Sequence, residues 1–230
     1  MNDMMAAGAT MGAVISLINY WIGLKIKEKT KLSICNPLLI SIILTVLFVL
    51  IFRIDYDTYN ASAKYLSWLL TPATVSLAIP LYLEIDRLKK NIKAILVSIF
   101  AGSVISMGSI LLMSMLFGFS HSQFVTFLPK SITTAIGMSV SEELGGFVSI
   151  TVAAIIVTGI LGAVIADTVC KVFHITDPVA QGLAIGTSAH AIGTSRAMEM
   201  GDVQGAMSSL SIVTAGIITV VGANIFASFL

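Results

Sequence analysis

The stretch Ala184–Glu199, AIGTSAHAIGTSRAME, places hydroxyls, a histidine, an arginine and a glutamate inside a strongly apolar chain. Polar, glycine-rich backbone at membrane depth is costly, so it persists where it lines a protein cavity or a solute path. The sequence AIGTS occurs twice in this stretch, seven positions apart. If the stretch stayed helical, Thr187, His190 and Thr194 would share one face. The segment is therefore the first candidate for a functional site.

The composition is that of a membrane protein. Of 230 residues, 57% are hydrophobic and 11% are charged, whereas soluble domains have about 25% charged residues. A spanning helix needs about 20 apolar residues, and the qualifying stretches are Ala6–Leu24, Ser33–Phe52, Tyr65–Tyr82, Ile92–Phe119, Phe147–Val172 and Ala206–Leu230. Two less apolar segments, 127–140 and 179–197, are rich in small and hydroxyl residues. We predict an all-α polytopic protein with one membrane domain, 1–230, about six full spans and two broken or re-entrant segments.

The basic residues predict the orientation. Four lysines lie in loop 25–31 and four basic residues lie in segment 87–93, two spans later. Both loops must face the same side, which the positive-inside rule makes the cytoplasmic one. The residues before the first span include Asp3 and no basic residue, so we interpret that span as a retained helix and not as a signal peptide. Topology explains the basic clusters, and we expect no nucleic-acid partner.

A short pattern recurs along the chain. PATVSLAIP at Pro72–Pro80 matches PKSITTAIG at Pro129–Gly137, and TSAHAIG at Thr187–Gly193 repeats its ending. Proline and glycine weaken a helix, and paired broken helices near the midplane are typical of the binding site of secondary transporters. We expect the helix breaks at Pro72, Pro80, Pro129, Gly137, Gly186 and Gly193. The repeat halves would be 33–119 and 127–230, either inverted or parallel.

Two basic residues stand near these breaks. Arg196 stays charged and its planar fork suits a carboxylate, but it could instead pair with Glu199 or reach the interface. Lys130 follows a proline at an expected helix start, and the N-terminus of a helix attracts anions. The alternative is that Lys130 lies among the lipid headgroups. The candidate solute-binding residues are Arg196, His190, Thr187, Ser188, Thr194, Ser195, Lys130, Ser131, Thr133 and Thr134. The candidates for proton coupling are Glu142, Glu143 and Glu199, the first two of which could equally be ordinary loop charges.

Other features have simpler interpretations. Gly182 and Gly186 form GxxxG, which favours tight helix packing as an alternative role for the 184–199 stretch. Asn36–Pro37 and Asp177–Pro178 are typical of an N-cap and a first-turn proline, and Asp167 is at helical spacing from Lys171. Cys35 and Cys170 lack partners at metal-ligand spacing, so we expect free thiols and no metal. The sequence contains no phosphate loop, GxSxG or HExxH motif, and we expect neither an enzyme nor a bound cofactor.

Several motifs together resemble the LrgB/CidB family of bacterial membrane proteins, and the SITTAIG and SEELGG stretches are closer to its CidB-like members. The motifs are NPLL at Asn36, LTPATVSLAIPLY at Leu70–Tyr82, LPKSITTAIG at Leu128–Gly137, SEELGG at Ser141–Gly146, GTSAHAIGTSRAME at Gly186–Glu199 and GAMSSL at Gly205–Leu210. The resemblance covers nearly the whole chain. It implies a bacterial cytoplasmic membrane protein that acts with a small LrgA/CidA-type membrane partner.

The resemblance implies two alternative functions. Bacterial members are linked to control of murein hydrolase activity and cell lysis, by analogy with holins and antiholins. Other relatives are similar to plastid glycolate and glycerate carriers and to bacterial pyruvate transporters. Because polar groups concentrate at breaks in apolar helices and not along one continuous face, we predict a carrier of small monocarboxylates that forms homo-oligomers. The alternative is a holin-like or antiholin-like regulator of lysis.

Overall fold

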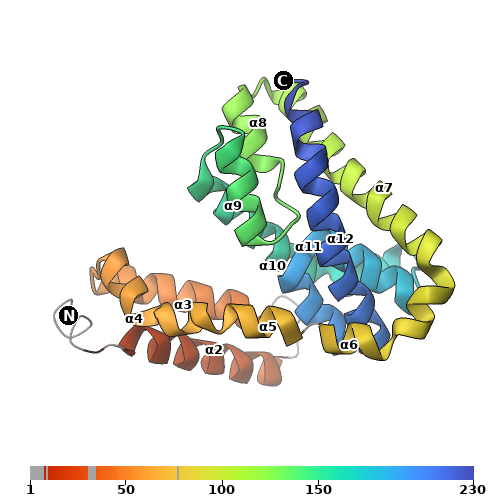
Figure 1. Cartoon of the computed structure of the whole chain (residues 1–230). Coiled ribbons are helices and arrows are strands. Elements are labelled where there is room, and N and C mark those ends of the chain that lie inside the picture. Colours follow the sequence, from red (N-terminus) through yellow and green to blue (C-terminus); the bar gives the residue numbers. More distant parts are fainter. Residues whose placement is uncertain (1–7, 9, 31–34, 77) are drawn as a thin grey trace. The chain divides into compact units, whose positions relative to one another are not determined.

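The computed structural model describes residues 8, 10–30, 35–76 and 78–230, and within these ranges all regular secondary structure is helical (Figure 1). The chain divides into two compact units, Met1–Ser76 and Leu77–Leu230. This boundary reflects which residues pack together. It does not test the repeat halves 33–119 and 127–230, which stay a prediction. The start of the span expected at Ala6–Leu24, residue Ser33 of the next span, and Lys31 of the first basic loop lie outside the described residues.

The first unit contains four helices in its described part, α2 (Met11–Thr30), α3 (Pro37–Ile51), α4 (Tyr56–Trp68) and α5 (Leu70–Ser76). Helix α2 packs closely on α3, because a Cβ atom on Gly23 would lie 2.5 Å from the carbonyl oxygen of Pro37. The side chain of Asn36 accepts hydrogen bonds from the backbone of Leu38 and Leu39 at the start of α3. The predicted cap at Asn36–Pro37 is therefore confirmed.

The stretch Tyr65–Tyr82 is not one continuous spanning helix. Helix α4 ends at Trp68, α5 begins at Leu70, and α6 covers Ala78–Leu83. Pro72 and Pro80 are the third residues of α5 and α6. Proline is tolerated in the first turn of a helix because the backbone N–H groups there have no intrahelical partner. The prolines thus stand where two short helices start, and the expected full span is replaced by short segments.

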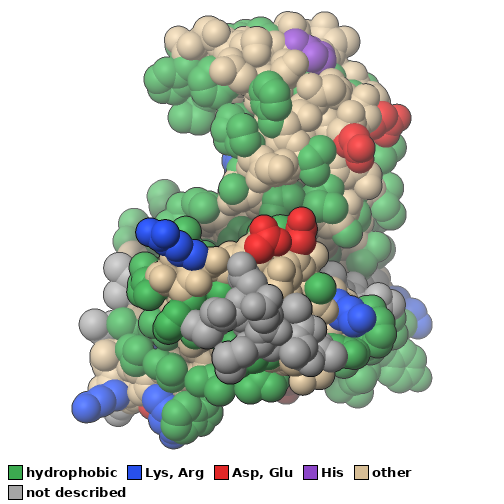
Figure 2. Space-filling view, turned by 90° about the vertical axis from the view of Figure 1, so that its left-hand side faces the viewer, with side chains coloured by type: hydrophobic (Ala, Val, Ile, Leu, Met, Phe, Trp, Pro, Cys, Tyr) green, Lys and Arg blue, Asp and Glu red, His purple; other side chains and the backbone are tan. Residues whose placement is uncertain are grey.

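The second unit is built around three long helices, α7 (Ile85–Phe117), α10 (Val148–Val172) and α12 (Asp202–Ala227). Within the described residues, Lys89–Phe117 of α7 and the whole of α10 and α12 are long and apolar enough to cross a membrane. Large apolar side chains such as Phe100, Leu116 and Ile217 are exposed on them. Hydrophobic side chains are also spread over the face shown in Figure 2, where charged side chains are few. The chain is therefore an all-helical membrane protein.

A first hairpin connects α7 with α10. Helices α8 (His121–Phe127) and α9 (Thr134–Glu143) are joined by residues 128–133. A ring nitrogen of His121, at the start of α8, lies 3.3 Å from the carbonyl oxygen of Leu144, directly after α9. The segment 121–143 therefore returns to the end of α7 from which it started. We call it hairpin 1.

A second hairpin lies within α11 (Pro178–Met200), which is two helices joined at His190. The backbone of His190 has φ 42° and ψ −139°, which is not helical. A Cβ atom on Gly193 would lie 3.0 Å from Cγ2 of Ile185, although residues eight apart in a straight helix are separated by about 12 Å. The chain therefore doubles back at His190. We call the segment 178–200 hairpin 2.

The two hairpins start from opposite ends of α10. Hairpin 1 ends just before Val148, where α10 begins, and hairpin 2 starts a few residues after Val172, where α10 ends. A helix of 25 residues is about 37 Å long, which is enough to separate the two ends across a membrane. Both predicted interrupted segments, 127–140 and 179–197, thus lie in chain reversals that approach each other from opposite ends of the same helix (Figure 1).

Candidate functional site

A cavity of about 700 Å³ lies between α7, hairpin 1 and hairpin 2. Four of the predicted solute-binding residues line it, namely Lys130, Ser131, Thr187 and Ser188. Along α7 the lining runs from Asn91 to Ser106, a distance of about 22 Å for a helix. The end near Asn91 and Asp177 is exposed. At the other end Ser131 is buried and Lys130 and Ser106 are half-buried, although Ile105 and Ser188 beside them are exposed. We call this less exposed end, near Lys130, the closed end of the cavity.

The closed end gathers polar groups from three elements. The ammonium of Lys130 donates to the hydroxyl of Ser131 at 3.1 Å, and this hydroxyl lies 3.0 Å from that of Ser106 on α7. Within the described residues, Lys130 forms no ion pair. The Thr187 hydroxyl likewise has no hydrogen-bond partner among them. Gly102 allows Thr187 to approach α7, because a Cβ atom there would lie 2.9 Å from Cγ2 of Thr187.

His190 forms the turn of hairpin 2 and is only 2% exposed. Its Nε2 atom lies 3.0 Å from the carbonyl oxygen of Ile155 on α10. Gly159, one turn further along α10, makes room for the ring, since a Cβ atom there would lie 2.7 Å from Cε1 of His190. The contacts of His190 thus attach the tip of hairpin 2 to the middle of α10. They do not place its side chain in the lining of the cavity.

Thr194 does not share a face with Thr187, because the helix is interrupted between them. Its hydroxyl donates to the carbonyl oxygen of His190 at 2.9 Å and lies 2.7 Å from the hydroxyl of Ser208 on α12. Gly186 packs against Ser208 as well. The expected stripe of hydroxyl, imidazole and hydroxyl on one helix face is therefore wrong. His190 packs against α10 and Thr194 against α12, whereas Thr187 faces α7 and the cavity.

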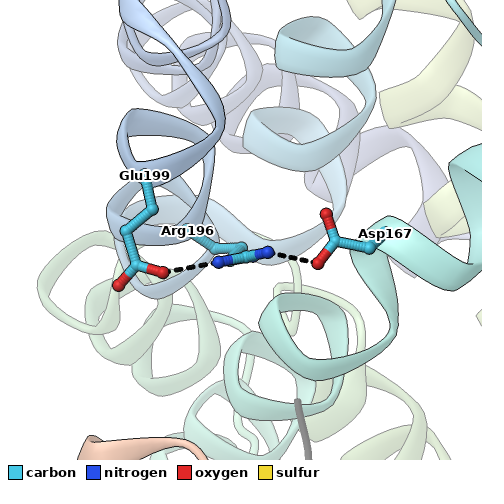
Figure 3. A network of polar contacts seen from close by, with 3 residues as sticks. All are labelled: Asp167, Arg196 and Glu199. Atoms are coloured by element: carbon cyan, nitrogen blue, oxygen red, sulfur yellow. Dashed lines mark hydrogen bonds and ion pairs between the residues drawn. The ribbon is translucent and has the colours of Figure 1, made fainter. Parts of the chain in front are cut away.

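Arg196 lies between two carboxylates (Figure 3). Its Nη1 atom donates to Oε2 of Glu199 at 2.6 Å, and its Nη2 atom pairs with the carboxylate of Asp167 on α10. The pairing of Arg196 with Glu199, which the sequence left open as an alternative to solute binding, is present. The sequence suggested Lys171 as the partner of Asp167. The structure instead pairs the carboxylate of Asp167 with the guanidinium of Arg196. The charge of Arg196 is thus matched inside the protein.

The remaining candidates lie elsewhere. Ser195 donates to the backbone of Ala191 at 3.4 Å, and Thr133 and Thr134 are at the start of α9. Glu142 and Glu143 end α9 and are exposed at the base of hairpin 1. None of these residues is part of the cavity lining.

The predicted helix breaks divide into two groups. Pro129 belongs to the connection between α8 and α9, where the chain leaves helical geometry. Gly137, Gly186 and Gly193 instead lie within helical segments. Gly137 accommodates Ile155 of α10, because a Cβ atom on it would clash with Cδ1 of that residue. These glycines therefore serve close packing, and the second break is at His190.

Sequence reasoning missed the residues that face the site from neighbouring helices. Gly159 and Gly162 of α10 lie against His190 and Ala189 at the tip of hairpin 2, and Ser106 of α7 joins Ser131. Small residues on apolar helices were the available signal, since they let membrane helices approach closely. That signal does not say which helices meet.

The fold and the cavity define a class, that of helical membrane proteins with two helical hairpins around a cavity that is mainly apolar and has polar groups at one end. A family model described as the LrgB-like family matches residues 16–229, and the chain belongs to this family. The chain is similar to the antiholin-like protein LrgB of Bacillus mycoides (strain KBAB4), at 35% identity over 220 residues, covering 95% of this chain and 96% of the relative. The antiholin-like proteins LrgB of Bacillus cereus (strain B4264) and Bacillus anthracis (strain CDC 684 / NRRL 3495) show the same identity and coverage. No solved structure matches the chain significantly.

Proposed function

We propose that this protein is an antiholin-like regulator of murein hydrolase activity and cell lysis in the bacterial cytoplasmic membrane. The observation that carries this proposal is the 35% identity to proteins named antiholin-like, which extends over 95% of the chain. The match spans both the hairpins and the long helices, so it includes every element around the cavity. The role is regulatory and not enzymatic, and a small LrgA/CidA-type membrane protein is its proposed partner.

Deletion of the gene in its own bacterium tests this function. We expect the deleted strain to lyse faster in a detergent-induced autolysis assay and to show stronger murein hydrolase bands in gels that contain cell walls. Expression of the intact chain from a plasmid should restore the slower lysis. Unchanged lysis and hydrolase activity in the deleted strain would contradict the proposal.

A second candidate function is transport of small monocarboxylates, and the cavity between the two hairpins favours it. A carboxylate that enters a membrane needs both a compensating charge and hydrogen-bond donors. The closed end of the cavity supplies the ammonium of Lys130 and the hydroxyls of Ser131 and Thr187. Re-entrant segments that meet near the midplane are a recurring arrangement in carriers with alternating access. A carrier that disturbs the proton gradient would also affect lysis.

The sides of the membrane follow from the basic loops. If segment 87–93 is cytoplasmic, α7 starts on the cytoplasmic side, and the exposed end of the cavity near Asn91 faces the cytoplasm. Hairpin 1 then enters from outside and hairpin 2 from inside. Lys171 and Arg196 also lie toward the inner end, as the positive-inside rule requires.

Proteoliposomes test the carrier function. They should take up labelled pyruvate or glycolate in a saturable way, with the purified chain alone or together with its small membrane partner, and should retain a trapped inert dye. The chain is proposed to work as a homo-oligomer, which cross-linking in the same liposomes would detect. Leakage of the dye without saturable uptake would contradict the carrier and favour a pore.

A further inference from the structure

Hairpin 1 carries Lys130 and hairpin 2 carries Arg196, and the surroundings of these two cations differ. The guanidinium of Arg196 has carboxylates on both sides, those of Asp167 and Glu199. An arginine with two acidic partners offers no unmatched positive charge to a solute. It also lies outside the lining of the 700 Å³ cavity.

Lys130 has the opposite surroundings. Its ammonium lines the closed end of the cavity, and its hydrogen bond in the described structure goes to the hydroxyl of Ser131. An ammonium has three donors, so two remain available to a bound molecule. Asp177 is the other charged residue of the lining. It accepts a hydrogen bond from the backbone of Ala180 at the exposed end, and Thr187 is ten residues further along hairpin 2, about 15 Å for a helix.

Among the described residues, the closed end thus holds the positive charge of Lys130 without a carboxylate beside it. A charge in such surroundings is stable only with an opposite charge or strong hydrogen bonds. A molecule with one negative charge would balance Lys130, whereas a molecule with two would bring an uncompensated charge into the same space. The hydroxyl of Thr187, which lacks a partner among the described residues, can bond a second oxygen of the bound molecule.

We propose that Lys130 selects singly charged organic anions in this cavity, and that Arg196 serves instead to attach hairpin 2 to α10. The assignment deepens the proposed carrier function and rests on the cavity of that proposal. It predicts that a monocarboxylate with a neighbouring hydroxyl or keto oxygen binds at the closed end, and that a dicarboxylate of similar size does not.

A thiol at position 188 reports the charge of the cavity without requiring transport. Ser188 is exposed and belongs to the lining, so the variant Ser188→Cys, with Cys35→Ser and Cys170→Ala, has one reactive thiol. The full chain in detergent is treated with an anionic methanethiosulfonate carrying a sulfonate and, separately, with a cationic one carrying a trimethylammonium group. The ratio of the two rates cancels the intrinsic reactivity of the thiol and leaves the effect of the local charge.

We expect Lys130→Gln to lower the ratio of anionic to cationic rates by about fivefold or more, and Lys130→Arg to preserve it. Lys93→Gln, which removes an exposed lysine of α7 outside the lining, is the matched control and should leave the ratio within about twofold. An unchanged ratio in Lys130→Gln, or an equal fall in Lys93→Gln, would overturn the assignment to Lys130.

Protection of the same thiol separates this assignment from the carrier function. Sodium pyruvate should slow the modification of the thiol at position 188 when Lys130 is present, and sodium malonate at equal concentration should not. Equal protection by malonate would overturn the selection for a single charge. A charge ratio that depends on Lys130 would still support the electrostatic assignment if proteoliposomes showed no uptake, and only the carrier function would then fail.

Discussion

Arg196 on α11 is ion-paired with Asp167 on α10, a residue 29 positions earlier in the chain. The two side chains are 28% and 23% exposed, so both are largely withdrawn from solvent. Glu199 contacts the other edge of the guanidinium from within the same helix. The pair therefore joins the returning helix of hairpin 2 to the last turns of α10, near the base of the hairpin (Figure 3).

This relationship predicts a non-additive loss of stability. Asp167→Asn and Arg196→Gln should each lower the free energy of unfolding by about 2 kcal/mol, the scale of a hydrogen bond to a charged group. The double variant should lose less than the sum, because the two residues act on each other. Thermal unfolding of the purified chain in detergent measures all three.

Lys171→Gln provides the control for that cycle. Lys171 is four residues from Asp167 and exposed, so helical spacing alone would make it the partner. We expect its replacement to change stability by less than about 0.5 kcal/mol, as for most surface substitutions. If Lys171→Gln lowered the free energy of unfolding as much as Arg196→Gln, the ion pair between Arg196 and Asp167, 29 residues apart, would not be the one that stabilises the protein.

A second prediction concerns the close approach of α10 to the tip of hairpin 2. A Cβ atom at Gly159 would lie 2.9 Å from Nε2 of His190 and 2.9 Å from Cβ of Ile192. We expect Gly159→Ala to destabilise the protein by about 1–3 kcal/mol, the usual range for overpacking. Gly108→Ala on α7 is the matched control, since its nearest neighbour would be 3.9 Å away. Equal melting temperatures for the two variants would argue against the packing of hairpin 2 on α10.

The backbone at His190 leads to a third prediction, in which glycine is better tolerated than alanine. The φ of 42° with ψ of −139° is a conformation that side chains with a Cβ atom rarely adopt. Both His190→Gly and His190→Ala lose the contact with Ile155, but glycine is relieved of the backbone strain. We expect the free energy of unfolding of His190→Gly to exceed that of His190→Ala by about 1 kcal/mol. His190→Gly should therefore unfold at the higher temperature. The reverse order would mean that the chain does not turn at this residue.

The features that the sequence predicted well are those that involve residues within one turn of each other. Asn36 and Asp177 cap the helices that begin at the prolines following them, and Arg196 contacts Glu199 three positions away. Each of these contacts depends on local geometry alone. The presence of two interrupted segments was likewise readable, because hydroxyls and glycines at membrane depth are unusual.

What could not be predicted depends on contacts between distant helices. The partner of Asp167 comes from another helix, and the turn at His190 is possible because Gly159 and Gly162 of α10 leave room for it. Helical spacing cannot detect either relationship. For the same reason the sequence placed Thr187 and Thr194 on one face, whereas the reversal sends the first toward the cavity and the second toward Ser208.

The opposed hairpins make a last prediction about the two sides of the membrane. Glu143 is exposed at the base of hairpin 1, and His174 is exposed after the end of α10, at the base of hairpin 2. Single thiols at Glu143→Cys and His174→Cys, without the native cysteines, should react with a membrane-impermeant maleimide from opposite sides. In intact cells the first should be labelled, and the second should require inverted vesicles.

The direction of this result follows from the basic segment at the start of α7. Lys93→Cys is the reference, since Lys93 lies in the segment that the positive-inside rule makes cytoplasmic, and it should label together with the thiol at position 174. Labelling of positions 143 and 174 from one side would mean that α10, which lies between them, does not cross the membrane. In that case α10 could not separate the bases of the two hairpins, and the cavity could not lie between segments that enter from opposite faces.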